Sequence, residues 1–340
     1  MCTHGLDVRY EGWMPRPPLA LPALLFMSGC MGPSAFATGR PTTEQDYRPV
    51  GELQHGLALA GPDVGFAAHF DMNVVRQGPL GAAVEAAVTA NAGDGSEAVR
   101  SALLEASGVW VFVTARPNDV VDTVFVLEGT SADALREYAG TLRSNGFLRA
   151  EHGVMEYVVG DLQVAHRSPD TVVVGDSRDR SGQQGSVWDW TDWADRLRGV
   201  SRAEQEPEFT TTRDALGAAH SPIWAAWRWS PELSTSLWGG LAGPTTPEHE
   251  ASLSRAAGLG FAALPVDGGF TVRAIARASD PDHAAALAAA LPSAVPAFAR
   301  FAPDPAIQID GPNAYATFTI TPEALTGLLA ATTARARVVP

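Results

Sequence analysis

The sequence contains no lysine, and all 24 of its basic side chains belong to arginine. A Walker-type phosphate loop, a Schiff-base lysine and the Ser-x-x-Lys nucleophile each require a side-chain amine. The absence of lysine therefore excludes these three classes of enzyme site.

Cysteine is almost absent as well, since the chain has only Cys2 and Cys30. Asp7 and Glu11 are acidic, so residues 1–13 do not resemble the basic start of a signal peptide, whereas the segment that begins at Met14 does. We expect residues 1–13 to be an upstream extension outside the true protein. Cys30 is then the one cysteine that remains, and no disulfide can form within the chain.

The chain also has no basic excess, because its formal net charge is −14. Partners such as nucleic acid or an anionic membrane surface require a basic footprint. The eight histidines show no metal-binding spacing such as His-x-x-x-His. We therefore expect no nucleic-acid partner, no metal and no cofactor.

Residues 14–29 have the three parts of a signal peptide in the usual order. Arg16 supplies a basic head, Leu19–Met27 is an uninterrupted apolar run, and small residues follow at Ser28 and Gly29. The apolar run is shorter than the roughly twenty residues that a transmembrane helix needs. The segment predicts export, not a permanent membrane span.

The four residues Met27–Cys30 (MSGC) resemble the lipobox of bacterial lipoprotein precursors. The resemblance implies cleavage before Cys30 and a diacylglyceryl group on its thiol, so that the membrane becomes a partner through lipid. Met31 follows where inner-membrane lipoproteins of Gram-negative bacteria typically carry aspartate, and by this resemblance we expect the outer membrane. The alternatives are an ordinary secretory signal cut near residues 35–37, or an apolar segment inside the fold.

Composition and pattern divide the rest of the chain. Residues 30–61 are rich in Gly, Pro, Thr and charge and predict a flexible tether. Two units, 62–180 and 220–330, show the same succession of strand, paired helices, hairpin, helix and strands. Between them, residues 181–219 predict a helical connector, and residues 331–340 form a C-terminal tail.

This succession predicts an α+β fold, made of two degenerate repeats whose antiparallel sheets are covered by helices. Turn-rich segments predict hairpins around residues 116–119, 267–269 and 310–313. Helices are expected at 80–90, 96–106, 132–144, 231–241, 248–257 and 280–291. The first strand is expected within residues 64–75.

One pattern suggests an enzyme. Gly175-Asp176-Ser177 and Asp280-Pro281-Asp282-His283 resemble the nucleophile block and the Asp-x-x-His block of the SGNH esterases. The resemblance implies that Ser177 attacks, His283 takes the proton and Asp280 orients the histidine. In that family alternating parallel strands and helices follow the serine block, whereas antiparallel-type strands precede Ser177 here. Asp280 is also placed to cap a helix.

A second pattern is the tryptophan pair Trp227 and Trp229, which strand alternation places on one side of a strand. Exposed indoles stack on sugars and anchor protein partners. A buried pair would instead fill the core between sheet and helix. The sequence leaves both interpretations open.

These observations together predict a lipid-anchored envelope protein with a binding or scaffolding role and no evident catalysis. Its partners would be an envelope protein or a glycan. The alternatives are an SGNH-like esterase using Ser177 and His283, or a binding module built on the tryptophans.

Overall fold

The structure is a computed structural model, and it describes residues 64–77, 81, 102, 104–116, 120–130, 148–151, 154–159, 162–168, 171–176, 207–218, 221–230, 233, 246–266, 269–294 and 305–321. Several predictions lie outside these residues. They are the extension at 1–13, the signal peptide and lipobox, the tether, the helix at 132–144, Ser177 and the tail at 331–340, together with all but Gly81 of the helix at 80–90 and all but Leu233 of the one at 231–241.

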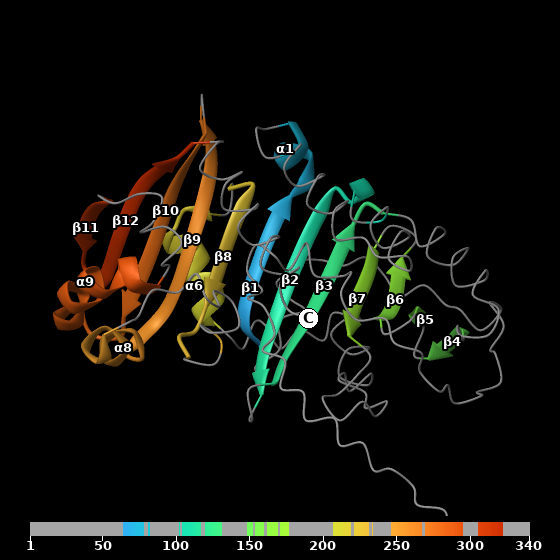
Figure 1. Ribbon diagram of the computed structural model, residues 1–340, viewed down its shortest axis with the longest axis horizontal. Helices are drawn as coiled ribbons and strands as arrows, with labels where there is room; N and C mark the ends of the chain where they lie inside the picture. Colours follow the sequence, from blue (N-terminus) through green and yellow to red (C-terminus); the bar gives the residue numbers. More distant parts are fainter. Residues whose placement is uncertain are drawn as a thin grey trace, which may run out of the picture.

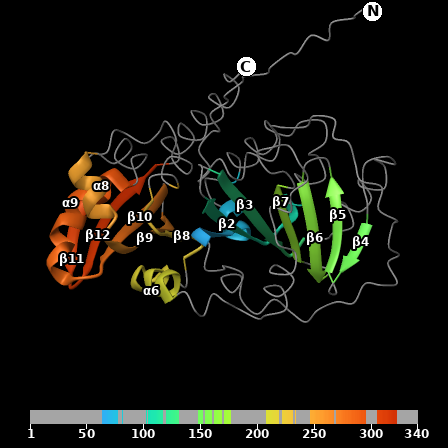
Figure 2. The same ribbon diagram turned by 90° about the horizontal axis from the view of Figure 1, so that it is seen from below.

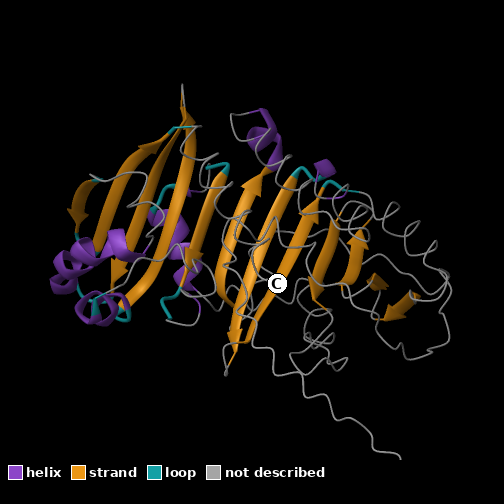
Figure 3. Ribbon diagram, in the orientation of Figure 1, coloured by secondary structure: helices purple, strands orange, loops and turns teal. Residues whose placement is uncertain are grey.

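The described strands form one antiparallel sheet of twelve strands in the order β11-β12-β10-β9-β8-β1-β2-β3-β7-β6-β5-β4 (Figures 1 and 3). Their bounds are β1 Val64–Asp71, β2 Gly108–Arg116, β3 Val120–Glu128, β4 Leu148–Glu151, β5 Val154–Val159, β6 Leu162–Ser168, β7 Thr171–Asp176, β8 Ile223–Trp227, β9 Ala256–Val266, β10 Gly269–Ala278, β11 Ala306–Asp310 and β12 Asn313–Ile320.

The prediction of an α+β fold with helix-covered sheets is wrong, because the described structure is mostly β. Its α-helices are four, α1 Met72–Gln77, α6 Pro207–Ala215, α8 Pro247–Leu253 and α9 Ala284–Ala294, with a short 3₁₀ helix η7 at Pro281–His283. The strands of the two predicted units join one sheet through the pairing of β1 with β8. The boundaries of the units stay a prediction.

Asp71 explains why the first strand is shorter than its apolar run. Its carboxylate accepts hydrogen bonds from the backbone N–H groups of Asn73 and Val74, at 3.0 and 3.2 Å. An aspartate in this position caps a helix N-terminus. The chain therefore leaves the sheet at Asp71 and forms α1.

The two halves of the sheet have the same strand order when they are followed outward from the central β1–β8 pair. In each half, the first three strands lie side by side in chain order, and the last strand and then the next-to-last strand follow them. The order is β1-β2-β3-β7-β6 in one half and β8-β9-β10-β12-β11 in the other. The first half then continues with β5 and β4, which have no counterpart beyond β11 in the part of the chain that the structure describes. The sheet therefore ends differently on its two sides.

Two glycines of β9 allow α6 to lie close against one face of the sheet. A Cβ at Gly258 would stand 2.4 Å from Thr212 Oγ1, and one at Gly260 would stand 2.9 Å from Leu216 Cδ1. No real side chain tolerates such distances. Glycine at these positions thus sets the approach of α6, which Figure 2 shows on the opposite side of the sheet from α8.

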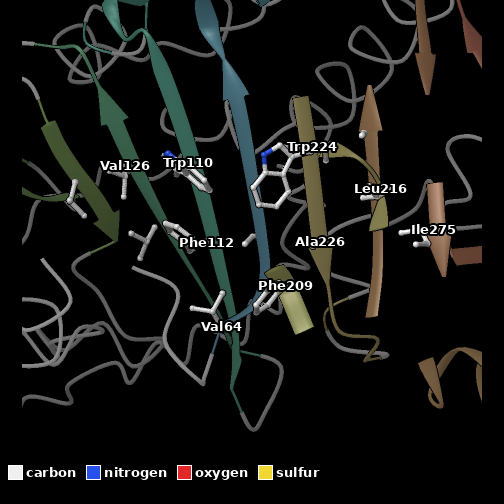
Figure 4. Packing of buried hydrophobic residues seen from close by; sticks show 14 of the residues in the cluster. Val64, Trp110, Phe112, Val126, Phe209, Leu216, Trp224, Ala226 and Ile275 are labelled. Atoms are coloured by element: carbon white, nitrogen blue, oxygen red, sulfur yellow. The ribbon is translucent and has the colours of Figure 1, made fainter. Parts of the chain in front are cut away.

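The core under α6 is a continuous apolar cluster that crosses the whole centre of the sheet (Figure 4). Phe209 and Leu216 reach it from the α6 region, while Trp110, Phe112 and Trp224 reach it from the strands. Its fifteen buried members are Val64, Ala67, Trp110, Phe112, Val124, Val126, Val173, Phe209, Leu216, Ala218, Trp224, Ala226, Ala262, Ile275 and Tyr315. Burial of these side chains supplies the main driving force for packing the two halves of the sheet into one structure.

Candidate functional site

A polar cluster lies where β1 and β3 end and β2 begins. His69 pairs with Trp110 across β1 and β2, and Gly108 pairs with Glu128 across β2 and β3. The ring centroids of His69 and Trp110 are 4.5 Å apart. The indole Nε1–H of Trp110 donates a 3.0 Å hydrogen bond to Glu128 Oε1.

Gly108 lies at the centre of this cluster. A Cβ built on Gly108 would stand 2.7 Å from Glu128 Oε2 and 3.4 Å from His69 Nε2. A carboxylate oxygen and an imidazole nitrogen therefore approach the same point above the glycine. A side chain at position 108 would displace one of them.

Ser107, the residue that precedes β2, fixes the backbone at Glu128 through hydrogen bonds. Ser107 donates from both its N–H and its Oγ to the carbonyl oxygen of Glu128, at 2.7 and 3.1 Å. Gly129 follows with a φ of +68°, and a Cβ there would meet Ser107 Oγ at 2.3 Å. Next to it, Thr130 Oγ1 is buried and has no hydrogen-bond partner among the described residues.

The cluster combines a half-buried carboxylate and an imidazole, and it borders the buried indoles of Trp110 and Trp224, whose ring centroids are 5.6 Å apart. A carboxylate and an imidazole are polar groups of the kind that fix the orientation of a ligand in small-molecule sites. The nearby Ser107 hydroxyl is already bonded to a backbone carbonyl. This arrangement suits binding better than nucleophilic attack.

No group of three or more His, Cys, Asp or Glu side chains that could hold a metal ion occurs in the part of the chain that the structure describes. In the same part, no helix is long and apolar enough to cross a membrane.

A second electrostatic feature joins β8 to α6. Arg228 donates through Nε to Glu208 Oε2 at 2.8 Å, and its guanidinium lies 5.6 Å from the ring centroid of Phe209. Burial lowers the pKa of Arg228 from its usual value, because desolvation disfavours the charged form. The contact positions α6 over the end of β8.

The structure places the two tryptophans of the predicted site in different environments. Trp227 is only 2% exposed and packs against Phe66 and Phe261, with ring centroids 6.3 and 6.2 Å away. Its indole is part of the core and is not available to stack on a ligand. Trp229 follows the strand and is half-buried, so it keeps contact with solvent.

The predicted esterase residues that the structure describes have other partners. Asp280 accepts a 3.1 Å hydrogen bond from the N–H of Asp282 and caps η7. The Nε2 of His283 lies 2.8 Å from a guanidinium nitrogen of Arg255. Ser177 is outside the described residues, and the triad stays a prediction.

Sequence reasoning missed His69, Gly108 and Glu128. A signal did exist, since His69, which is half-buried, interrupts the otherwise apolar stretch VGFAAHF. Glu128 is the last residue of its strand, and in the sequence it looks like an ordinary polar residue at the end of an apolar segment. Only the pairing of β2 with β3 brings it onto Gly108.

No family model and no curated protein matches the chain. Among solved structures, crystal form III of TP0453 is similar with a TM-score of 0.51 and 11% sequence identity, covering 81% of this chain and 97% of that chain. Crystal form I of TP0453 has a TM-score of 0.49 and 12% identity, covering 82% of this chain and 97% of that chain. The likeness to crystal form III shows a shared fold and nothing about activity.

Proposed function

We propose that this chain is a lipid-anchored envelope protein with a binding or scaffolding role. The observation that carries the proposal is the apolar run Leu19–Met27, followed directly by Ser28, Gly29 and Cys30. Lipid on Cys30 would hold the protein at the outer membrane, and residues 31–61 would separate the sheet from the bilayer. The proposed anchor needs no basic surface, which agrees with a net charge of −14.

The anchor is tested by replacing Cys30 with alanine and following the chain through membrane fractionation. We expect the wild-type chain in the membrane fraction and the Cys30→Ala chain in the soluble envelope fraction. Mass spectrometry of the wild-type N-terminal peptide should show a diacylglyceryl-modified cysteine. Cys2→Ala is the matched control and should change neither result. A Cys30→Ala chain that stayed with membranes would contradict the proposal.

The binding role is best supported by the His69 and Glu128 groups that converge on Gly108. The adjacent indole of Trp110 would report a ligand through its fluorescence. We therefore expect soluble peptidoglycan fragments, as a glycan probe, to change the tryptophan emission of the wild-type protein. Glu128→Gln should weaken the response, while Glu208→Gln, on α6, should not. A wild-type protein without any response would rule out glycan binding at this cluster.

A further inference from the structure

Strand β11 forms an exposed edge of the described sheet. All five residues of this strand are exposed, and it is the terminal strand of the sheet order. Ile307 and Ile309 point to the same face and are 44% and 49% exposed. They account for two of the four large hydrophobic side chains that are exposed in the described part of the chain.

Edge strands are normally protected by charged side chains, proline or a bulge, because their free N–H and C=O groups can pair with another chain. The sequence of β11 is AIQID, and its one charge is Asp310 at the end. Its pairing with β12 runs from Ala306 to Asp310 without a register shift. The strand has none of the usual protecting features along its central three residues.

The other half of the sheet shows what this edge can accept. The strand in the place that corresponds to β11 is β6, and its outer edge is filled by β5 in antiparallel pairing. Beyond β11 the equivalent place is empty among the described residues. The architecture thus accommodates one more antiparallel strand there.

The sequence of β11 is complementary to itself in antiparallel pairing. With Gln308 placed opposite Gln308 of the partner subunit, Ile307 stands opposite the partner's Ile309. Directly opposed β-branched side chains stabilise a strand pair. Asp310 then stands opposite the partner's Ala306, so the two aspartates lie at opposite ends of the pair.

We propose that two copies of this chain associate through β11, antiparallel and related by a two-fold axis, so that the sheet continues from one copy into the other. A symmetric dimer of this kind uses the same patch on both subunits. Repulsion between two chains of net charge −14 opposes the dimer. Salt screens this repulsion, with a Debye length of about 8 Å at physiological ionic strength. The dimer should therefore strengthen as salt is added.

Cysteine cross-linking of the full-length chain in the envelope tests the geometry. Opposed Cβ atoms in antiparallel strands lie about 4.5–5.5 Å apart, near the range that a disulfide spans. Gln308→Cys should give a covalent dimer on a non-reducing gel. Leu264→Cys, at a residue 50% exposed on the β9–β10 hairpin, is the matched control and should stay monomeric. The wild-type chain measures any background from Cys2 and Cys30.

Charge placed at the edge gives an independent readout. Ile309→Lys changes an exposed side chain, so the fold should be retained, but two lysines then enter each symmetric interface. We expect dimer association, measured by sedimentation, to fall about tenfold or more, and Leu264→Lys to leave it unchanged. A Gln308→Cys chain that gives no covalent dimer, together with a wild-type chain that sediments as a monomer, overturns the proposal. A dimer that only Leu264→Lys weakens would overturn it too, by locating the interface at the hairpin.

Discussion

The indole N–H of Trp110 on β2 donates a 3.0 Å hydrogen bond to the carboxylate of Glu128 at the end of the neighbouring strand β3. This contact joins a side chain that is 6% exposed to a carboxylate at the border of the solvent. An indole N–H in a buried position needs such a partner. The pair therefore connects the apolar cluster under α6 with the polar cluster around Gly108.

Removing the acceptor should destabilise the fold. Glu128→Leu leaves the Trp110 N–H without its partner, and we expect the free energy of unfolding to fall by about 1–3 kcal/mol. Glu128→Gln keeps an acceptor oxygen and should cost less. Urea unfolding followed by circular dichroism measures both. Equal stability of the wild-type and Glu128→Leu proteins would show that the bond contributes nothing.

The close approach at Gly108 predicts an interaction between two substitutions. Gly108→Ala places a Cβ 2.7 Å from Glu128 Oε2, so the carboxylate must move and the protein should lose stability. Shortening the acid in Gly108→Ala/Glu128→Ala relieves the clash. We expect a coupling of about 0.5–3 kcal/mol in a double-mutant cycle of unfolding free energies. Additive effects of the two changes would contradict this geometry.

Trp227 and Trp229 should behave differently although they are close in sequence. Trp227→Ala removes a buried ring from the core, which typically costs about 3–5 kcal/mol. Trp229→Ala removes a half-buried ring after the strand and should cost clearly less. Thermal or urea unfolding of the two variants provides the comparison. If Trp229→Ala proved the more damaging change, the assignment of Trp227 to the core would be in doubt.

The Arg228–Glu208 pair should contribute little as an ion pair, because its side chains are 36% and 46% exposed. We expect Glu208→Ala to cost less than about 1 kcal/mol, and less still at high salt. Arg228→Ala should cost more, since it also loses packing over Phe209. Unfolding in low and high salt separates the two contributions. A large, salt-independent loss in Glu208→Ala would be contrary to this account.

Local sequence patterns located most strands because alternation and turn residues act over a few positions. The predicted hairpin at 310–313 is confirmed by the pairing of Asp310 with Asn313, and the one at 267–269 by the pairing of Val266 with Gly269. Helix ends were less predictable. The helix expected through Ala257 ends at Leu253, since β9 already begins at Ala256.

The candidate site was not predictable from the sequence, because it depends on contacts between distant positions. His69, Gly108 and Glu128 meet only after β1, β2 and β3 have paired in register. Likewise, the sequence did not decide whether Trp227 belongs to the core or to a ligand site. Its neighbours Phe66 and Phe261, which come from other strands, decide that it is buried.

The sequence by itself determined the absence of lysine chemistry and the turns that separate neighbouring strands, and the proposal of export and lipidation at Cys30 rests on it alone. These depend on residue identity or on spacing along a short segment. Tertiary structure alone decided that β1 and β8 pair and so join all described strands in one sheet. The physical reason is that strand pairing uses backbone groups that every residue carries, so the choice of partner comes from burying both faces of the whole sheet.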